Sequence, residues 1–239
     1  MIETWLLLMV VALIASAIAA VAGTGGGIIL LPVLISVFGV REAVPMYAVA
    51  QLIGNLSRVW FNWREIEFRV VGWFALGALP CALLGAWLFT QLPDAALLRL
   101  LGAFLILSVL LRHLYPAMRQ SFAPHWFVPI GGVFATVSAI VGSAGPFLAP
   151  FYLSYGLVKG AFIGTEALGT ALMHVAKLGS YQGLDAMSAT IWLTGLLLGP
   201  VMILGSWLGK VFLDRIPGHI FVWLVEGVVL LFGIGFLIL

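Results

Sequence analysis

Apolar runs follow one another along almost the whole chain. A membrane-spanning helix needs about 20 predominantly apolar residues, and several of these runs reach or approach that length. Of the 239 residues, 63% are hydrophobic and only 8% are charged, whereas soluble domains have roughly 25% charged residues. We therefore expect an all-α polytopic membrane protein that has the lipid bilayer as a partner and does not bind nucleic acid.

Sequence motifs of several other protein classes are missing. The chain has no Cys/His ligand spacing, nucleophile elbow or phosphate-binding loop, so we expect no metal, no cofactor and no enzymatic activity. Its single cysteine, Cys81, excludes an intrachain disulfide. Only Glu3 is charged before the first apolar segment, Trp5–Ala22, so we interpret that segment as mature structure rather than as a signal peptide.

Two stretches of the sequence repeat at a nearly constant spacing. Residues 23–27 (GTGGG) correspond to residues 142–146 (GSAGP), 119 positions later. "PCALLGAWL" (Pro80–Leu88) corresponds to "PVMILGSWL" (Pro200–Leu208) at an offset of 120. Ordered blocks with matching spacing indicate an internal repeat.

We expect one integral membrane domain made of two homologous halves, residues 1–118 and 119–239, each with five helical segments. The expected segments of the first half are Trp5–Ala22, Ile28–Phe38, Glu42–Trp63, Phe68–Gln91 and Ala95–Leu114. Those of the second half are Trp126–Val141, Phe147–Tyr155, Lys159–Tyr181, Ala186–Phe212 and Pro217–Leu239. The second segment of each half makes a helix of roughly 15 Å, about half the hydrocarbon core.

The distribution of lysine and arginine indicates how each short segment runs. If the first two segments of each half form a hairpin, eight cations lie toward one side of the membrane: Arg58, Arg64, Arg69, Arg112, Arg119, Lys159, Lys210 and Arg215. Three lie toward the other: Arg41, Arg99 and Lys177. A single crossing by each pair would divide the cations evenly. The positive-inside rule favours the hairpins, with both termini outside, and the halves then form the inverted-topology repeat of many secondary transporters.

We interpret the two glycine-rich stretches as the tips of broken helical hairpins inside the membrane. Irregular backbone at that depth is buried in protein or lines a cavity, and the short helix after each tip has its positive N-terminal end near the midplane. Two such tips predict an anion site; close packing of small residues is the alternative. The tip residues are Gly23, Thr24, Gly25, Gly26, Gly27, Gly142, Ser143, Ala144 and Gly145.

The third segment of each half carries a polar face at helical spacing. The two faces consist of Tyr47, Gln51, Asn55 and Arg58 and, 119 residues later, Glu166, Thr170, His174 and Lys177. We expect six of these residues to bind the substrate: Gln51, Asn55, Arg58, Thr170, His174 and Lys177. Interhelical hydrogen bonding is the alternative for Gln51, Asn55 and Thr170. In the hairpin topology Arg58 lies toward the cytoplasmic mouth and Lys177 toward the outer mouth, where they attract an anion or snorkel to the interface.

Three residues are candidates for proton coupling: Glu166, His174 and Glu226. Carboxyl and imidazole groups inside a membrane commonly belong to proton relays. Glu226 has no acidic counterpart in the first half, so a structural carboxyl that bonds to a neighbouring helix is the alternative for it.

These residues resemble a known family. "AGTGGGIILLPVLISVFGV" is similar to the first signature of the sulfite exporter TauE/SafE family, and "AIVGSAGPFLAPFYLSYGLVKGAFIGTEALGTAL" is similar to its second-half signature. The resemblance covers essentially the whole chain. It implies a bacterial inner-membrane transporter that exports sulfite or an organosulfonate.

We therefore expect a secondary transporter, an exporter of small sulfur-containing anions such as sulfite or short organosulfonates. An anion channel and, from another class, a membrane-embedded enzyme are the alternatives. The sequence leaves open which anion is carried, the direction of transport and the coupling ion. A homo-oligomer is compatible with it.

Overall fold

The computed structural model describes residues 2–22, 27–114, 123–143, 145–212 and 230–238. Within these residues the protein is all-helical and has no strand, which confirms the predicted class. The helices are α1 (Ile2–Ala22), α2 (Gly27–Phe38), α3 (Val40–Asn62), α4 (Phe68–Gln91), α5 (Asp94–Leu114), α6 (Phe127–Val141), α7 (Gly145–Ser154), α8 (Lys159–Gly183) and α9 (Ala189–Phe212). Two 3-10 turns, η1 (Trp63–Glu65) and η2 (Pro124–Trp126), accompany them.

The predicted segments match the observed helices to within three residues at every described end. Of the tenth predicted segment, only residues 230–238 are described, and they are helical. Several predicted residues lie outside the described ranges: Gly23, Thr24, Gly25, Gly26, Ala144 and Glu226.

Four described helices are long and apolar enough to cross a membrane: Ile2–Ala20, Phe68–Gln91, Pro124–Val141 and Ala189–Val211. This confirms a multi-pass membrane protein. α2 and α7 have only 12 and 10 residues, and at 1.5 Å per residue neither crosses a hydrocarbon core of about 30 Å. α3 and α8 are long, with 23 and 25 residues, but far more polar.

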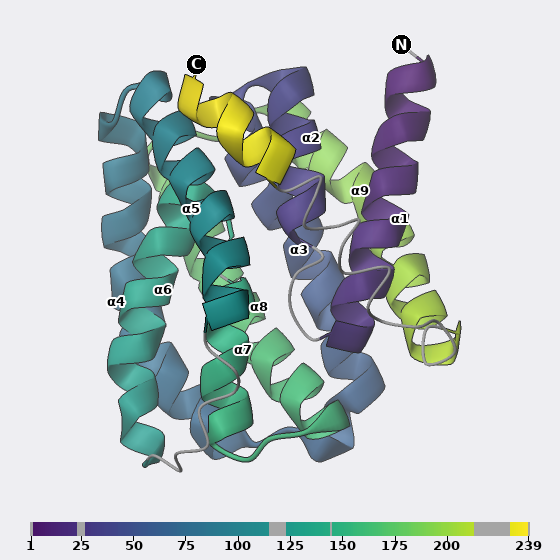
Figure 1. Cartoon of the computed structure of the whole chain (residues 1–239), viewed down its shortest axis with the longest axis vertical. Coiled ribbons are helices and arrows are strands. Elements are labelled where there is room, and N and C mark those ends of the chain that lie inside the picture. The colour runs from purple at the N-terminus through teal and green to yellow at the C-terminus, as the bar shows by residue number, and fades with distance from the viewer. Residues whose placement is uncertain (1, 23–26, 115–122, 144, 213–229, 239) are drawn as a thin grey trace.

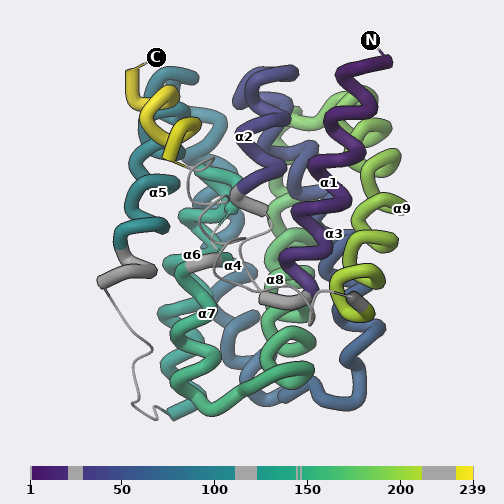
Figure 2. Tube along the Cα trace, turned by 45° about the vertical axis from the view of Figure 1, so that its right-hand side comes forward, coloured from purple at the N-terminus to yellow at the C-terminus, as the bar shows by residue number. Residues whose placement is uncertain are grey.

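In each of the two sequence halves, the first helix and the second helix run in opposite directions. α1 descends from the end of the molecule that carries the N-terminus, and α2 returns toward that end (Figure 1). α6 rises from the opposite end, and α7 returns to it (Figures 1 and 2). α2 and α7 therefore occupy different halves of the molecule along its long axis.

Two glycines bring the helices of different halves into close contact. α4 packs on α6 and α8, while α9 packs on α1 and α3. A Cβ added at Gly85 of α4 would lie 2.6 Å from the carbonyl oxygen of Thr136, and one at Gly205 of α9 would lie 2.4 Å from that of Leu13. Gly85 and Gly205 occupy the same position in the two repeated sequence blocks. Their lack of a side chain lets the backbones approach.

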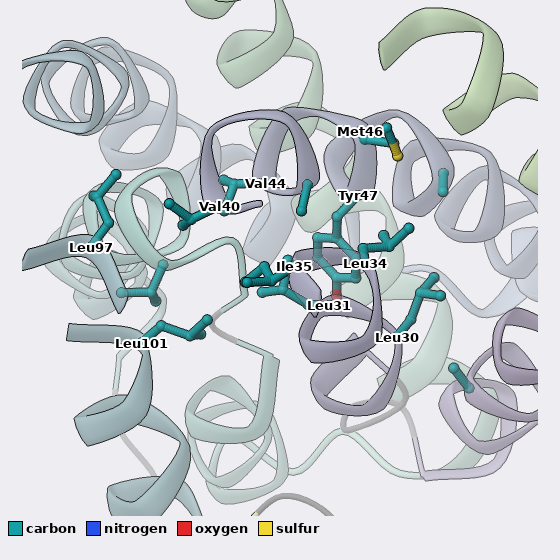
Figure 3. Close-up of a cluster of buried hydrophobic side chains, with 14 of the residues drawn as sticks. Leu30, Leu31, Leu34, Ile35, Val40, Val44, Met46, Tyr47, Leu97 and Leu101 are labelled. Atoms are coloured by element: carbon teal, nitrogen blue, oxygen red, sulfur yellow. The ribbon is translucent and has the colours of Figure 1, made fainter. Parts of the chain in front are cut away.

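An apolar cluster holds α2 against its neighbours (Figure 3). Four buried side chains of α2 belong to it: Leu30, Leu31, Leu34 and Ile35. They pack with Val44 and Tyr47 of α3, and with Leu101 of α5. Lipid tails are as apolar as leucine, so close van der Waals packing, rather than exclusion from water, holds this short helix in place.

Candidate functional site

The polar faces predicted on the third segments meet in the interior of the protein. α3 and α8 pack against each other, and both faces are buried at this contact. All eight residues are buried: Tyr47, Gln51, Asn55, Arg58, Glu166, Thr170, His174 and Lys177. Polar and ionisable groups inside a membrane protein are costly, so this buried cluster is the candidate functional site.

Arg58 connects the two halves of the chain through a buried ion pair. Its Nη1 lies 3.2 Å from Oε2 of Glu166, and the two side chains are 6% and 3% exposed. Nη2 donates to Oδ1 of Asn55, and Nη1 also lies 3.3 Å from the carbonyl oxygen of Ala19, in the last turn of α1. The spacing of each polar face predicted these residues singly, but not that Arg58 pairs with Glu166.

The Glu166 carboxylate is bound at both of its oxygens. Oε2 accepts from Arg58, and Oε1 lies 3.2 Å from the hydroxyl of Thr170, one turn further along α8. Buried charges need such partners because leaving water is costly. The carboxylate is therefore held mainly by a cation from α3, because the Thr170 hydroxyl also donates to the backbone carbonyl oxygen of Glu166.

Lys177 binds the C-terminal end of α6. Its Nζ lies 2.8 Å from the carbonyl oxygen of Ser138, 3.0 Å from the Ser138 hydroxyl and 3.2 Å from the carbonyl oxygen of Gly142. The last carbonyls of a helix have no partner within it, and a cation at that end also complements the helix dipole. Ser138 was not predicted from the sequence. The feature that could have indicated it is its position near the end of the apolar segment that precedes the second glycine-rich stretch.

The burial of the two cations bears on the alternative that they snorkel to an interface, whereas their role in attracting anions stays a prediction. Arg58 and Lys177 were placed toward the two mouths, either attracting anions or snorkelling to an interface. The residues are 5% and 0% exposed, so neither side chain extends to the surface of the protein as snorkelling requires. Helix-end carbonyls and, for Arg58, a buried carboxylate hold the two cations inside the protein instead.

The second glycine-rich stretch forms a bend between α6 and α7. Gly142 ends α6 with a φ of 84°, a conformation that L side chains rarely adopt. Ser143 follows it and is buried, and Gly145 begins α7. A Cβ added at Gly142 would lie 2.6 Å from Cδ2 of Leu31 in α2, so this bend touches the short helix of the first half.

Two buried polar atoms have no partner among the described residues: Nδ1 of His174 and the hydroxyl of Tyr152. His174 follows Thr170 by one turn of α8, on the same face. The Tyr152 hydroxyl would lie 3.1 Å from a Cβ added at Gly169, so it also lies against α8. Tyr152 was not predicted from the sequence. The only feature that could have indicated it is the presence of a polar tyrosine hydroxyl within a half-length apolar helix.

The described residues offer no metal centre, since no three His, Cys, Asp or Glu side chains gather among them. The site is instead a buried set of charged and polar groups at the junction of α3, α6 and α8. Together with the fold, it defines an all-helical, multi-pass membrane protein with a charged interior.

The chain belongs to the sulfite exporter TauE/SafE family, whose sequence model matches residues 8–236. Membership implies a membrane transporter of the sulfite and anion exporter type, and it confirms the resemblance seen in the sequence. Neither the search of curated proteins nor that of solved structures found a match.

Proposed function

We propose that the protein is a secondary transporter that exports small sulfur-containing anions such as sulfite or short organosulfonates. Family membership supports the class of transporter. The observation that carries the proposal is the burial of Arg58, a residue of α3, where α3 packs on α8. These are the two most polar long helices. Intramembrane charges of this kind are costly and usually mark a substrate pathway.

We propose further that residues 1–118 and 119–239 are inverted-topology repeats. The opposite directions of the α1–α2 and α6–α7 pairs support this (Figure 2). The helix contacts support it too, because exchanging the halves converts the contact of α1 with α9 into that of α6 with α4, and the contact of α3 with α9 into that of α8 with α4. Inverted repeats commonly place a substrate site at their interface.

In this proposal the anion binds between the glycine-rich tips and the polar faces. The backbone N–H groups of the tips meet the anion at the start of α2 and α7, and Gln51, Asn55, Thr170 and His174 contribute polar side chains. Arg58 is the direct cationic ligand. Lys177 contributes mainly by holding the bend at Gly142, because its ammonium group already donates to oxygens of Ser138 and Gly142.

We place the protein in the bacterial inner membrane with both termini outside. The lysine and arginine distribution supports this orientation. At the end of α3 that we assign to the cytoplasmic side, Trp60 and Trp63 are 80% and 56% exposed, and tryptophan is enriched at membrane interfaces.

Flux into vesicles tests the proposed function. Purified protein in liposomes should carry sulfite, thiosulfate or methanesulfonate with saturation kinetics, and Arg58→Gln should abolish the flux. The matched control is Arg41→Gln, since Arg41 forms an exposed ion pair with Asp94 at 2.6 Å. Flux that rises without saturation would identify a channel, and absence of flux for all three anions would contradict the proposal.

A further inference from the structure

Glu166 presents to Arg58 the same chemistry as the proposed substrate. A carboxylate and a sulfonate both offer negatively charged oxygens, and guanidinium binds such groups strongly. We propose that the Glu166 carboxylate occupies the anion site of the substrate-free protein, and that the anion binds there only when Glu166 takes up a proton. This inference rests on the proposed anion transport, and it identifies the proton as the coupling ion.

The geometry around Arg58 shows why the anion and the carboxylate compete. Oε2 of Glu166 lies 3.2 Å from Nη1 of Arg58, and Oε1 lies 3.2 Å from the Thr170 hydroxyl. Nη2 donates to Asn55. An anion that takes the place of either carboxylate oxygen must therefore displace Glu166.

Charge balance then requires the proton. With Glu166 ionised, a bound anion would place two negative groups against one buried guanidinium, and like charges that share a site disfavour joint ionisation. With Glu166 protonated, the anion replaces the carboxylate and the charge of the pair is unchanged. The exchange converts the Arg58–carboxylate pair, one anion and one proton into an Arg58–anion pair and a neutral carboxylic acid, and its only new covalent bond is the O–H of Glu166.

The other groups that face Glu166 do not replace this proton. Tyr47 on α3 and Tyr152 on α7 interact with its charge but are themselves acids. Lys177 on the same helix directs its ammonium group to oxygens of Ser138 and Gly142. His174 is 4% exposed, and its Nδ1 has no partner among the described residues. It lies on the same face as Thr170 and offers a further polar contact once the anion has entered.

One proton therefore moves with each monovalent anion, in the same direction. Export needs an internal excess of the anion that outweighs an inward proton gradient. For binding, the sign of the pH effect follows from linkage: a ligand that binds with a proton binds best at low pH, and its affinity falls by up to tenfold per pH unit where Glu166 is ionised in the free protein.

Calorimetry on the purified full-length protein tests this exchange. The probes are methanesulfonate and thiosulfate, whose charges do not change between about pH 5.5 and 8.5, and proton uptake is followed with an indicator dye in weak buffer. We expect wild type to take up about one proton per methanesulfonate, with affinity falling as the pH rises. Glu166→Gln should bind at every pH with the low-pH affinity of wild type and take up no proton. The control Asp94→Asn, which breaks an exposed arginine pair, should behave as wild type.

The other outcomes decide against the proposal. Wild type that binds the anion without proton uptake would overturn it, whether or not Glu166→Gln folds. Proton uptake that persists in Glu166→Gln but is lost in His174→Gln would assign the proton to His174 instead. If wild type binds neither probe nor sulfite, the proposed function itself fails. If sulfite or methanesulfonate is transported and Glu166→Gln retains the wild-type pH profile, only the present inference fails.

Discussion

Arg58 and Lys177 stand 119 residues apart, and each donates to the last turn of the first helix of its own half. Arg58 Nη1 lies 3.3 Å from the carbonyl oxygen of Ala19, and Lys177 Nζ lies 2.8 Å from that of Ser138. Ala19 and Ser138 are also 119 residues apart. Both cations thus serve helix-end carbonyls deep in the protein. They differ in their remaining partners, because only Arg58 has a carboxylate, that of Glu166.

Lys177→Met should destabilise the protein strongly. The substitution removes the ammonium donor from the carbonyl oxygens of Ser138 and Gly142 and leaves Gly142 the Ser138 hydroxyl at 3.4 Å. Hydrogen bonds to charged groups contribute about 1.5–3 kcal/mol. We expect a lower midpoint of thermal unfolding in detergent, with the same loss at low and high salt because buried interactions are weakly screened. Lys210→Met is the control, since Lys210 is exposed and bonds to the Phe61 carbonyl oxygen at 2.5 Å. Equal losses in both variants would contradict this role of Lys177.

Gly85→Ala and Gly205→Ala should each separate a pair of helices. The added methyl groups would meet the carbonyl oxygens of Thr136 at 2.6 Å and Leu13 at 2.4 Å, and overpacking typically costs about 1–3 kcal/mol. Gly72→Ala, also in α4, has nothing within 4 Å of the added atom. We expect both test variants to unfold at a lower temperature than Gly72→Ala. Three indistinguishable midpoints would refute the close-approach role of these glycines.

Gly142→Ala should impair transport, whereas Gly156→Ala should not. Both glycines have positive φ, 84° and 101°, so alanine costs roughly 1–2 kcal/mol of backbone strain at either site. Only at Gly142 does the added Cβ meet another group, Cδ2 of Leu31 at 2.6 Å; at Gly156 it meets nothing within 4 Å. Sulfite flux into liposomes, normalised to folded protein, distinguishes the two variants. Comparable flux in both variants would show that transport does not depend on the bend at Gly142.

Cysteine labelling should place the α3–α4 and α8–α9 connections on opposite sides of the membrane. The two connections lie at opposite ends of the molecule (Figure 2). Glu65→Cys in η1 and Thr190→Cys at the start of α9 are both exposed positions, and neither change alters the lysine and arginine distribution that orients the chain. In a Cys81→Ala background, we expect an impermeant reagent to label Thr190→Cys in intact cells and Glu65→Cys only after the membrane is opened. Labelling of both in intact cells would contradict the inverted repeat.

Hydropathy and helical periodicity predicted the elements and the faces that they bury. α4 was predicted with the bounds that the structure has, Phe68–Gln91, because polar residues end each apolar run where a helix leaves the membrane. The four-residue spacing of Gln51 and Asn55, like that of Thr170 and His174, identified one interior face on each central helix. These properties are local, so the sequence determined them by itself.

The partners of the charged side chains were decided by the tertiary structure. Periodicity shows that Arg58 and Glu166 each lie on a buried face, but their pairing depends on how α3 and α8 are aligned where they pack. Lys177 is bound to Ser138 and Gly142 because the end of α6 lies beside α8, a placement that the sequence of α8 does not contain. Lys177 holds a helix end, and Arg58 also holds a carboxylate that an anion can replace. This difference follows from helix packing, because the energy of a buried charge depends on the atoms that surround it.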